Sequence, residues 1–232
     1  MTSSQFASRS TLPEKMDQDD VKPVEIEKAL NELAFINKYL GGYKVTLNAI
    51  NAIAAGKPLS VVDYGCGGGD VLRKIYDWGK KHNIQLKCTG VDINPVMINY
   101  CLKHNGDRKI QYLKMSIWDN ALLSIPCDVA VNSLFCHHFD DAELVVLLKR
   151  MHLHAARAVI INDLHRHSLA YHSIRILTNL FSGSYLVKYD GPLSVKRSLR
   201  KSEWIDVIEK ADVKKYSIKW FWAFRWQIIL LK

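Results

Sequence analysis

The sequence predicts an α/β fold with a doubly wound parallel sheet and helices on both faces. Strand-like and helix-like segments alternate along most of the chain. Near-continuous apolar runs, such as residues 129–131 and 158–161, are typical of parallel strands that are buried on both faces. A glycine-rich turn follows the first predicted strand, and open sheets of this kind bind ligands at the carboxyl ends of their strands.

The segment before the sheet is expected to hold a tail and two helices. Residues 1–23 are expected to form a flexible polar tail, because they are poor in apolar residues and rich in acids. The acids that lie closest together are Asp17, Asp19 and Asp20. Apolar residues at helical spacing predict a helix over residues 24–39, which a glycine pair ends. A second helix is expected over residues 43–55.

The remaining elements follow in alternation, and the 232 residues are enough for one domain with a substantial core. Parallel strands are expected around Val61 and over residues 88–92, 110–114, 127–132 and 158–162. Helices are expected to begin at Asp70 and Pro95, and to cover residues 141–151 and 202–211. Residues 215–222 and 226–231 are expected to pair as a terminal hairpin.

The most specific motif is the segment 61–70, VVDYGCGGGD. Val61 and Val62 suit a buried strand, and the alternate glycines let the backbone bend sharply and approach a ligand closely. Asp70 is expected to cap the helix that follows. Asp92 ends the next predicted strand, roughly 20 residues past the loop, where an acid binds ribose hydroxyls in nucleotide-binding βαβ units.

The order of acids and glycines separates two classes of cofactor. Nicotinamide and flavin enzymes carry G-x-G-x-x-G, but Asp70 stands at the position of the third glycine. Asp63 fits poorly beside a pyrophosphate and favours a ligand with a cationic amino group. With this acid-x-G-x-G-x-G motif, residues 41–232 resemble the class I S-adenosylmethionine-dependent methyltransferases. A dinucleotide oxidoreductase and a fold relative without activity are the alternatives.

The resemblance implies a Rossmann-like methyltransferase fold with a seven-stranded sheet, S-adenosylmethionine as cofactor and S-adenosylhomocysteine as product. Residues 57–232 would then form the methyltransferase domain, and residues 24–56 a helical lid, with a helical pair that only packs on the sheet as the alternative. The implied cofactor-binding residues are Asp63, Gly65, Cys66, Gly67, Gly69, Asp92, Ile93, Ser116, Ile117 and Asn132. Many relatives carry an acid where this chain has Ser116, so either Ser116 or Asp119 is expected to contact the adenine.

Histidines follow the fourth and fifth predicted strands. Methyl transfer from a sulfonium is an in-line displacement, which requires alignment and the removal of a proton from an oxygen acceptor. A histidine titrates near neutral pH and suits that task. We expect His165 to act as the base with Asp163 orienting it, and His138 or His137 is the alternative. A buried histidine without a chemical role is a further alternative, because a phenol can react through positioning alone.

The cysteines predict neither a disulfide framework nor a metal site. The five cysteines are an odd number without a C-x-x-C pair, which indicates reduced thiols and a cytoplasmic protein. No signal peptide or membrane span is expected. Cys136, His137 and His138 are consecutive, and adjacent residues rarely converge on one ion, so we expect no metal.

The segments after the last parallel strands favour a small-molecule acceptor. Residues 132–134 lack the pair of prolines that follows this strand in enzymes that methylate base amines. Residues 162–167 and 190–197 resemble a bacterial branch of these methyltransferases that is associated with polyketide or phenolic metabolites. That branch implies O-methylation of such a compound in secondary metabolism. The apolar residues of 170–187 would line the acceptor pocket, or alternatively form an amphipathic core helix.

The formal charge of +9 keeps other partners open. A basic cluster is typical of proteins that bind phosphate backbones, and an RNA methyltransferase is therefore the main alternative enzyme. The cluster comprises Lys188, Lys196, Arg197, Arg200 and Lys201. Peripheral contact with an anionic membrane is another possibility, and so is a regulatory protein that binds S-adenosylmethionine without catalysis. Nucleic acid is disfavoured, because no RNA-binding motif is visible.

Overall fold

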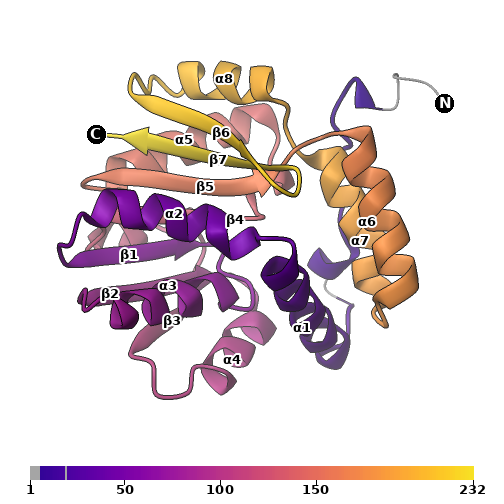
Figure 1. The fold of residues 1–232 in the computed structure, drawn as a ribbon, viewed down its shortest axis with the longest axis horizontal. Coiled ribbons are helices and arrows are strands. Elements are labelled where there is room, and N and C mark those ends of the chain that lie inside the picture. Colours follow the sequence, from indigo (N-terminus) through magenta and orange to yellow (C-terminus); the bar gives the residue numbers. More distant parts are fainter. Residues whose placement is uncertain (1–5, 19) are drawn as a thin grey trace.

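The computed structural model describes residues 6–18 and 20–232 and contains one seven-stranded sheet (Figure 1). The strand order is β3-β2-β1-β4-β5-β7-β6, and β7 is antiparallel to both of its neighbours. The strands are β1 (Leu59–Tyr64), β2 (Leu86–Asp92), β3 (Ile110–Lys114), β4 (Val129–Ser133), β5 (Ala158–Leu164), β6 (Tyr216–Phe221) and β7 (Arg225–Leu231). The prediction of a doubly wound α/β sheet with a terminal hairpin is confirmed.

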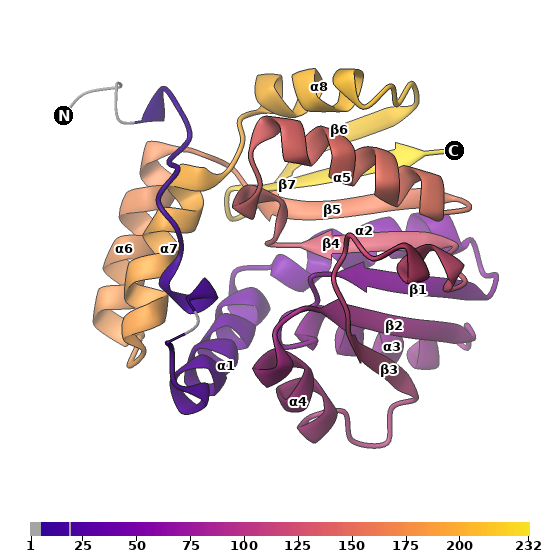
Figure 2. The ribbon, with the colours of Figure 1, turned by 180° about the vertical axis from the view of Figure 1, so that it is seen from behind.

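Helices cover both faces of this sheet. α2 (Gly42–Ala54) and α3 (Asp70–Lys81) lie in front of it in Figure 1, and α4 (Pro95–Lys103) shares their apolar cluster. α5 (Asp141–His154) and α8 (Lys201–Lys210) cover the opposite face, which Figure 2 shows from behind. The central strands β1, β4 and β5 are buried on both sides, as the near-continuous apolar runs predict, whereas the residues of the edge strand β6 are half-buried or exposed. Among the described residues, no helix has the length and hydrophobicity needed to cross a membrane.

Three helices lie beyond the carboxyl ends of the parallel strands. They are α1 (Pro23–Tyr39), α6 (Ser168–Phe181) and α7 (Tyr185–Arg197), on the right in Figure 1. The short 3-10 helices η2 (Lys15–Asp17) and η4 (Cys136–His138) lie at this same end, whereas η3 (Asn120–Ser124) follows β3. The apolar segment 170–187 therefore forms a helical hairpin outside the sheet and is not a core helix.

The N-terminal segment, defined here as residues 6–18, differs from the loose tail that its polarity predicts. Phe6 and Glu14 are buried, and Asp190 accepts hydrogen bonds from the backbone N–H groups of Lys15 and Met16 at 2.8 and 3.0 Å. The buried Arg166 donates to the carbonyl oxygen of Phe6 at 3.1 Å. These tertiary contacts outweigh the segment's composition. The expected tail also included residues 1–5 and Asp19, which lie outside the described residues.

Asp70 does not cap α3 as predicted. The N-cap is Gly69, in the left-handed conformation at φ +68°, and Asp70 is the first residue of the helix. The Asp70 carboxylate instead accepts hydrogen bonds from the Asn37 amide at 3.1 Å and the Tyr43 hydroxyl at 2.8 Å. Asp70 thus ties the glycine loop to α1 and α2.

We predict that the thiols of the folded protein react slowly near neutral pH. All five cysteines are free and buried, and burial raises the pKa of Cys88 and Cys127 to about 12. Ellman's reagent should therefore titrate the five thiols rapidly only after a denaturant has been added. A fast-reacting thiol in the native protein would contradict this packing.

Candidate functional site

Two cavities meet at the carboxyl ends of the parallel strands. The first, named here the glycine-loop cavity, has a volume of about 670 Å³ and is lined by the loop after β1 and by the end of β2. The second, the apolar cavity, has about 500 Å³ and lies between α1, α6, α7 and the β6–β7 turn. The residues that line both are Met16, Leu33, Leu134 and His138.

The glycines of the loop serve two different purposes. A Cβ atom on Gly67, at φ +50°, would meet nothing within 4 Å, so the loop leaves space for a ligand there. A Cβ atom on Gly65 would come within 2.6 Å of the Phe135 ring, and one on Gly69 within 2.8 Å of Cys101. Gly65, Cys66 and Gly67 line the glycine-loop cavity, as expected, whereas Gly69 packs against α4.

Asp63, at the end of β1, is a buried carboxylate that faces the glycine-loop cavity. Its Oδ1 atom has no hydrogen-bond partner within residues 6–18 and 20–232. Burial raises the pKa of Asp63 well above its ordinary value, and the nearby acids Asp70 and Asp92 raise it further. A buried acceptor without a donor is costly, and a cationic donor in the cavity would satisfy it.

Asp92 joins the end of β2 to the glycine loop. Its Oδ2 atom accepts a hydrogen bond from the Gly67 N–H at 2.9 Å, and Oδ1 accepts one from the Asn94 N–H at 2.9 Å. Burial raises its pKa, and the two backbone donors oppose that shift. A carboxylate has about four acceptor positions, so Asp92 can still accept hydroxyl donors from the cavity.

The far end of the glycine-loop cavity is lined by the expected Ile93, Ser116 and Ile117, and by Trp118, which the sequence analysis missed. Asp119 does not replace Ser116, because its carboxylate caps η3 by accepting from the Ala121 N–H at 2.9 Å. The sequence pattern that could have identified Trp118 is an aromatic residue in the loop that follows a predicted strand.

Asn132, expected near the cofactor, is not part of this cavity wall. Its amide donates to the Tyr64 carbonyl at 3.0 Å and its oxygen accepts from the Cys136 thiol at 3.1 Å. Because Asn132 is fully buried at the end of β4, its role is to join β4 to the adjacent β1.

Asp163 pairs with His137 and not with the expected His165. The His137 ring donates from Nδ1 to Asp163 at 2.8 Å, and the His137 backbone N–H donates to the other carboxylate oxygen at 3.1 Å. Burial would lower the pKa of His137, but Asp163 and Glu14 raise it to about 10. The two carboxylates therefore favour the protonated form of His137.

Glu14 reaches this pair from the N-terminal segment, and the sequence analysis missed it because the segment was expected to be loose. Its Oε1 atom lies 3.3 Å from His137 Nε2 and accepts from the Ser194 hydroxyl at 2.7 Å. Burial would raise the pKa of Glu14, but the two histidines and Ser194 lower it to about 2. The nearby apolar residues Pro13 and Met16, within an otherwise polar stretch, could have indicated that this segment packs against the protein.

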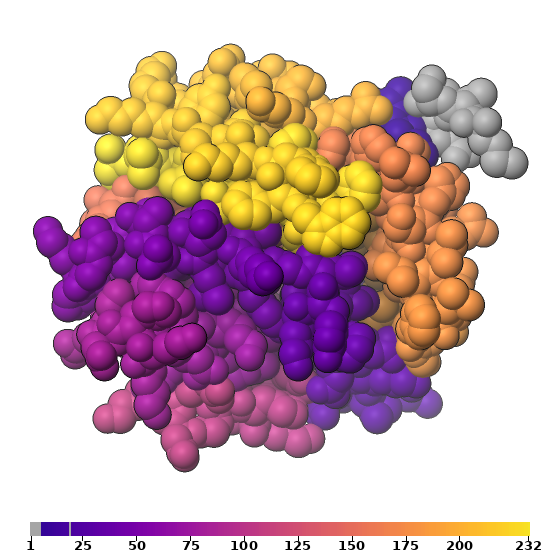
Figure 3. All heavy atoms as spheres, viewed as in Figure 1, coloured from indigo at the N-terminus to yellow at the C-terminus, as the bar shows by residue number. Residues whose placement is uncertain are grey.

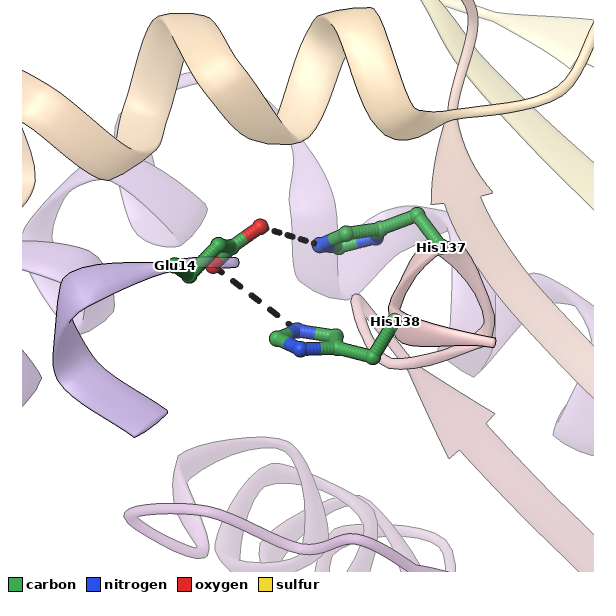
Figure 4. Close-up of side chains that lie close together, drawn as sticks. All are labelled: Glu14, His137 and His138. Carbon is green, nitrogen blue, oxygen red and sulfur yellow. Dashed lines mark ion pairs between the residues drawn. The ribbon is translucent and has the colours of Figure 1, made fainter. Parts of the chain in front are cut away.

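His138 stands where the two cavities meet. Its Nδ1 atom lies 2.8 Å from Asp17 Oδ2, and its Nε2 atom lies 3.8 Å from Glu14 Oε2. Figure 4 shows both histidine rings turned toward the Glu14 carboxylate. Of the expected histidines, His138 is therefore the one that contacts both cavities.

His165 lies away from both cavities. Its ring packs on Trp226 with a centroid distance of 4.6 Å, and its backbone N–H donates to the Phe224 carbonyl at 2.8 Å. Burial and the nearby cations together lower its pKa to about 4. The backbone pairing that follows β5 turns this ring away from Asp163, so the structure does not support the expected Asp163–His165 pair.

The apolar cavity opens on the face shown in Figure 3, between α1, α6 and the tip of the β6–β7 hairpin. α6 lines it with Ala170, Ile174 and Leu177, as the apolar pattern of 170–187 predicts. Trp222 and Phe224 line it from the β6–β7 turn. Such a wall suits a ligand with a large apolar surface.

Part of the predicted basic cluster is used inside the protein. Arg197 is buried and donates to the backbone carbonyls of His137 and His138 at 3.1 and 2.9 Å. Arg200 donates to the Phe6 carbonyl at 2.6 Å. Two of the five basic side chains therefore hold the N-terminal segment and η4, which weakens the case for a phosphate-binding surface.

Comparison with protein families places residues 61–157 in a family described as a methyltransferase domain. No curated protein sequence gives a significant match. The matched range runs from β1 to the residue before β5, and it therefore contains the glycine loop, Asp92 and η4.

Solved structures share the fold at low sequence identity. Human N-acetylserotonin methyltransferase, crystallised with S-adenosylmethionine, matches with a TM-score of 0.65 and 15% identity over 91% of this chain and 56% of that chain. The plantazolicin methyltransferase BpumL, in complex with S-adenosylhomocysteine, matches with a TM-score of 0.64 and 17% identity over 90% of this chain and 96% of that chain. A Nostoc punctiforme PCC 73102 protein described as a putative O-methyltransferase matches with a TM-score of 0.63 and 15% identity over 98% of this chain and 64% of that chain. The chain thus spans less than two thirds of the human and Nostoc proteins.

Proposed function

We propose that the chain is a class I S-adenosylmethionine-dependent methyltransferase and that it methylates a hydroxyl oxygen of a small apolar molecule. The match of residues 61–157 to a methyltransferase-domain family and the fold shared with solved methyltransferases support this proposal. A phenolic or polyketide-like secondary metabolite fits this description of the acceptor. The observation that carries the proposal is the junction of the two cavities at Leu134 and His138. A cofactor in one cavity and an acceptor in the other would meet beside a polar cluster.

The glycine-loop cavity fits S-adenosylmethionine. The free Oδ1 atom of Asp63 suits the cationic amino group of the methionine moiety, and the open space at Gly67 allows the loop to approach it. The remaining acceptor positions of Asp92 suit the ribose hydroxyls. Ile93, Ile117 and Trp118 would flank the adenine. When bound, S-adenosylmethionine supplies an electrophilic methyl carbon on its sulfonium sulfur.

The proposed reaction forms one bond and breaks one. The acceptor hydroxyl loses its proton to solvent at the polar junction, the oxygen–carbon bond forms, and the carbon–sulfur bond breaks. The products are a methyl ether, S-adenosylhomocysteine and one proton. The walls of the apolar cavity orient the acceptor, and positioning of this kind contributes much of the rate enhancement of a displacement.

The first test supplies the protein with methyl-labelled S-adenosylmethionine and a fractionated extract of the cells that make it. Label in solvent-extractable metabolites is the expected result. The variant Ile174→Trp would fill the apolar cavity, and loss of the label with this variant would locate the acceptor in that cavity. Label in RNA or protein would overturn the proposal in favour of a macromolecular acceptor. Cofactor binding without label in any fraction would indicate a regulatory protein.

We predict that S-adenosylhomocysteine, which keeps the amino group, releases a proton from Asp63 when it binds. Burial raises the pKa of Asp63 in the free protein, whereas a cationic amino group in the cavity favours the ionised carboxylate and lowers this pKa, so binding at a pH between the two values releases a proton. Affinity should therefore rise with pH until the free carboxyl is ionised. Calorimetry in two buffers of different ionisation enthalpy measures the proton released, and Asp63→Asn should abolish the release. Equal heats in both buffers with the wild-type chain would contradict the prediction, and the exposed Asp107→Asn serves as control.

A further inference from the structure

The polar cluster at the cavity junction has the features of a metal site. Glu14 comes from the N-terminal segment, and His137 and His138 come from η4 (Figure 4). One ligand atom from each of these residues lies within 4.8 Å of the others. The consecutive histidines converge because the 3-10 turn of η4 places their rings side by side, with centroids 4.5 Å apart.

A carboxylate fixes the orientation of each histidine ring. Nδ1 of His137 lies 2.8 Å from Asp163, and Nδ1 of His138 lies 2.8 Å from Asp17. Both distances are normal for charge-assisted hydrogen bonds. In metal sites, a ligating histidine nearly always donates its other ring N–H to a carboxylate or carbonyl in this way, which leaves Nε2 for the metal.

The Nε2 atoms of the two histidines lie farther from their carboxylate partner, Glu14, than the Nδ1 atoms lie from theirs. They lie 3.3 and 3.8 Å from the two oxygens of Glu14, which is long for a hydrogen bond between charged groups. Two ligand atoms of one tetrahedral zinc ion lie about 3.3 Å apart, because each bond to zinc is about 2.0–2.1 Å long. The spacing of 3.3 Å between His137 Nε2 and Glu14 Oε1 equals such an edge, and the spacing of 3.8 Å between His138 Nε2 and Glu14 Oε2 is somewhat longer.

The local charge can accommodate a divalent cation. Three carboxylates, of Glu14, Asp17 and Asp163, contact or face the two imidazoles, and the Arg197 guanidinium lies 4.0 Å from Glu14. With neutral imidazoles, three negative charges and one positive charge leave a net charge of minus two. One divalent ion would balance it.

The ligands are also held in place before any metal binds. Asp190 fixes the backbone of Lys15 and Met16, next to Glu14, and Ser194 donates to Glu14 itself. Arg197 donates to the carbonyls of both histidines, as described above, and also to that of Leu12 in the N-terminal segment. The cluster is therefore preorganised from both sides.

We propose that Glu14, His137 and His138 bind one divalent transition-metal ion, with zinc as the best chemical match to two imidazoles and one carboxylate. A ligand from the cavity junction, where His138 lies, would complete the coordination. This role rests on the proposed function: the acceptor hydroxyl would supply that ligand, lose its proton to solvent more readily, and attack the methyl carbon. Metal-bound oxygen ligands are far stronger acids than free ones, with a pKa of about 7 for zinc-bound water.

The test measures metal binding without cofactor or acceptor. The untagged full-length chain is stripped with a chelator, dialysed against zinc ions and analysed by elemental mass spectrometry, and about one zinc ion per chain is expected. Cobalt substituted for zinc should give visible absorption typical of tetrahedral coordination. Glu14→Gln and His138→Gln should each weaken zinc binding by more than tenfold. The exposed Glu209→Gln and His82→Gln are matched controls with no expected effect.

Circular dichroism verifies that each variant is folded. The measurement of zinc bound to the wild type tests the proposal even if a variant does not fold. Zinc binding by the wild type no tighter than by His138→Gln would overturn the inference. Methyl transfer at full rate by the stripped chain would overturn the assigned role while the proposed function stands. A chain that binds zinc but labels no metabolite would instead overturn the proposed function.

Discussion

Asp92→Ala is expected to weaken binding of S-adenosylhomocysteine by more than tenfold. The substitution removes an ionised acceptor, and hydrogen bonds to charged groups contribute about 1.5–3 kcal/mol. It also removes the partner of the Gly67 N–H, so the loop loses its attachment to β2. Isothermal titration calorimetry measures the dissociation constant directly.

The matched control for this prediction is Asp107→Ala, which removes an exposed acid from the loop after α4. Its affinity should equal that of the wild type. Because Asp92 is buried, the urea unfolding curve of each variant separates loss of affinity from loss of the fold. Unchanged affinity in folded Asp92→Ala would refute the assignment of this cavity to the cofactor.

Local sequence patterns were sufficient for the fold and for most of the residues that line the glycine-loop cavity. The β3 prediction, residues 110–114, matches the strand residue for residue, because its boundaries follow from a short apolar run between polar loops. The placement of Asp63, Gly67 and Asp92 around one cavity also follows from sequence, because parallel strands that pair in register end at the same edge of a sheet.

The polar cluster at the junction could not be predicted in the same way. Asp163 was expected at the site, but its partner depends on the turn after β4, where Leu134 adopts φ +53° and brings η4 back toward β5. Glu14 lies more than a hundred residues from both histidines in sequence, on a segment whose composition indicates disorder. Its position depends on tertiary contacts with Asp190 and Ser194 that have no local signature.

Asp163→Ala is expected to cause the largest loss of stability, about 3–5 kcal/mol, because it breaks a fully buried ion pair by removing one partner. The Asp163 carboxylate accepts hydrogen bonds from the His137 ring, the His137 backbone and the Leu164 backbone. The substitution leaves all of these donors without a partner in the interior. Urea unfolding followed by circular dichroism gives the difference in free energy of unfolding.

Two further variants separate charge from packing at this position. Asp163→Asn keeps an acceptor for the His137 ring and should lose less stability than Asp163→Ala. The control Asp206→Ala, at an exposed position on α8, should change the free energy of unfolding by no more than about 0.5 kcal/mol. If Asp163→Ala were as stable as Asp206→Ala, the buried pair would be neither formed nor needed. The position of η4, and with it the convergence of His137 and His138 on Glu14, would then depend on Arg197 and the N-terminal segment alone.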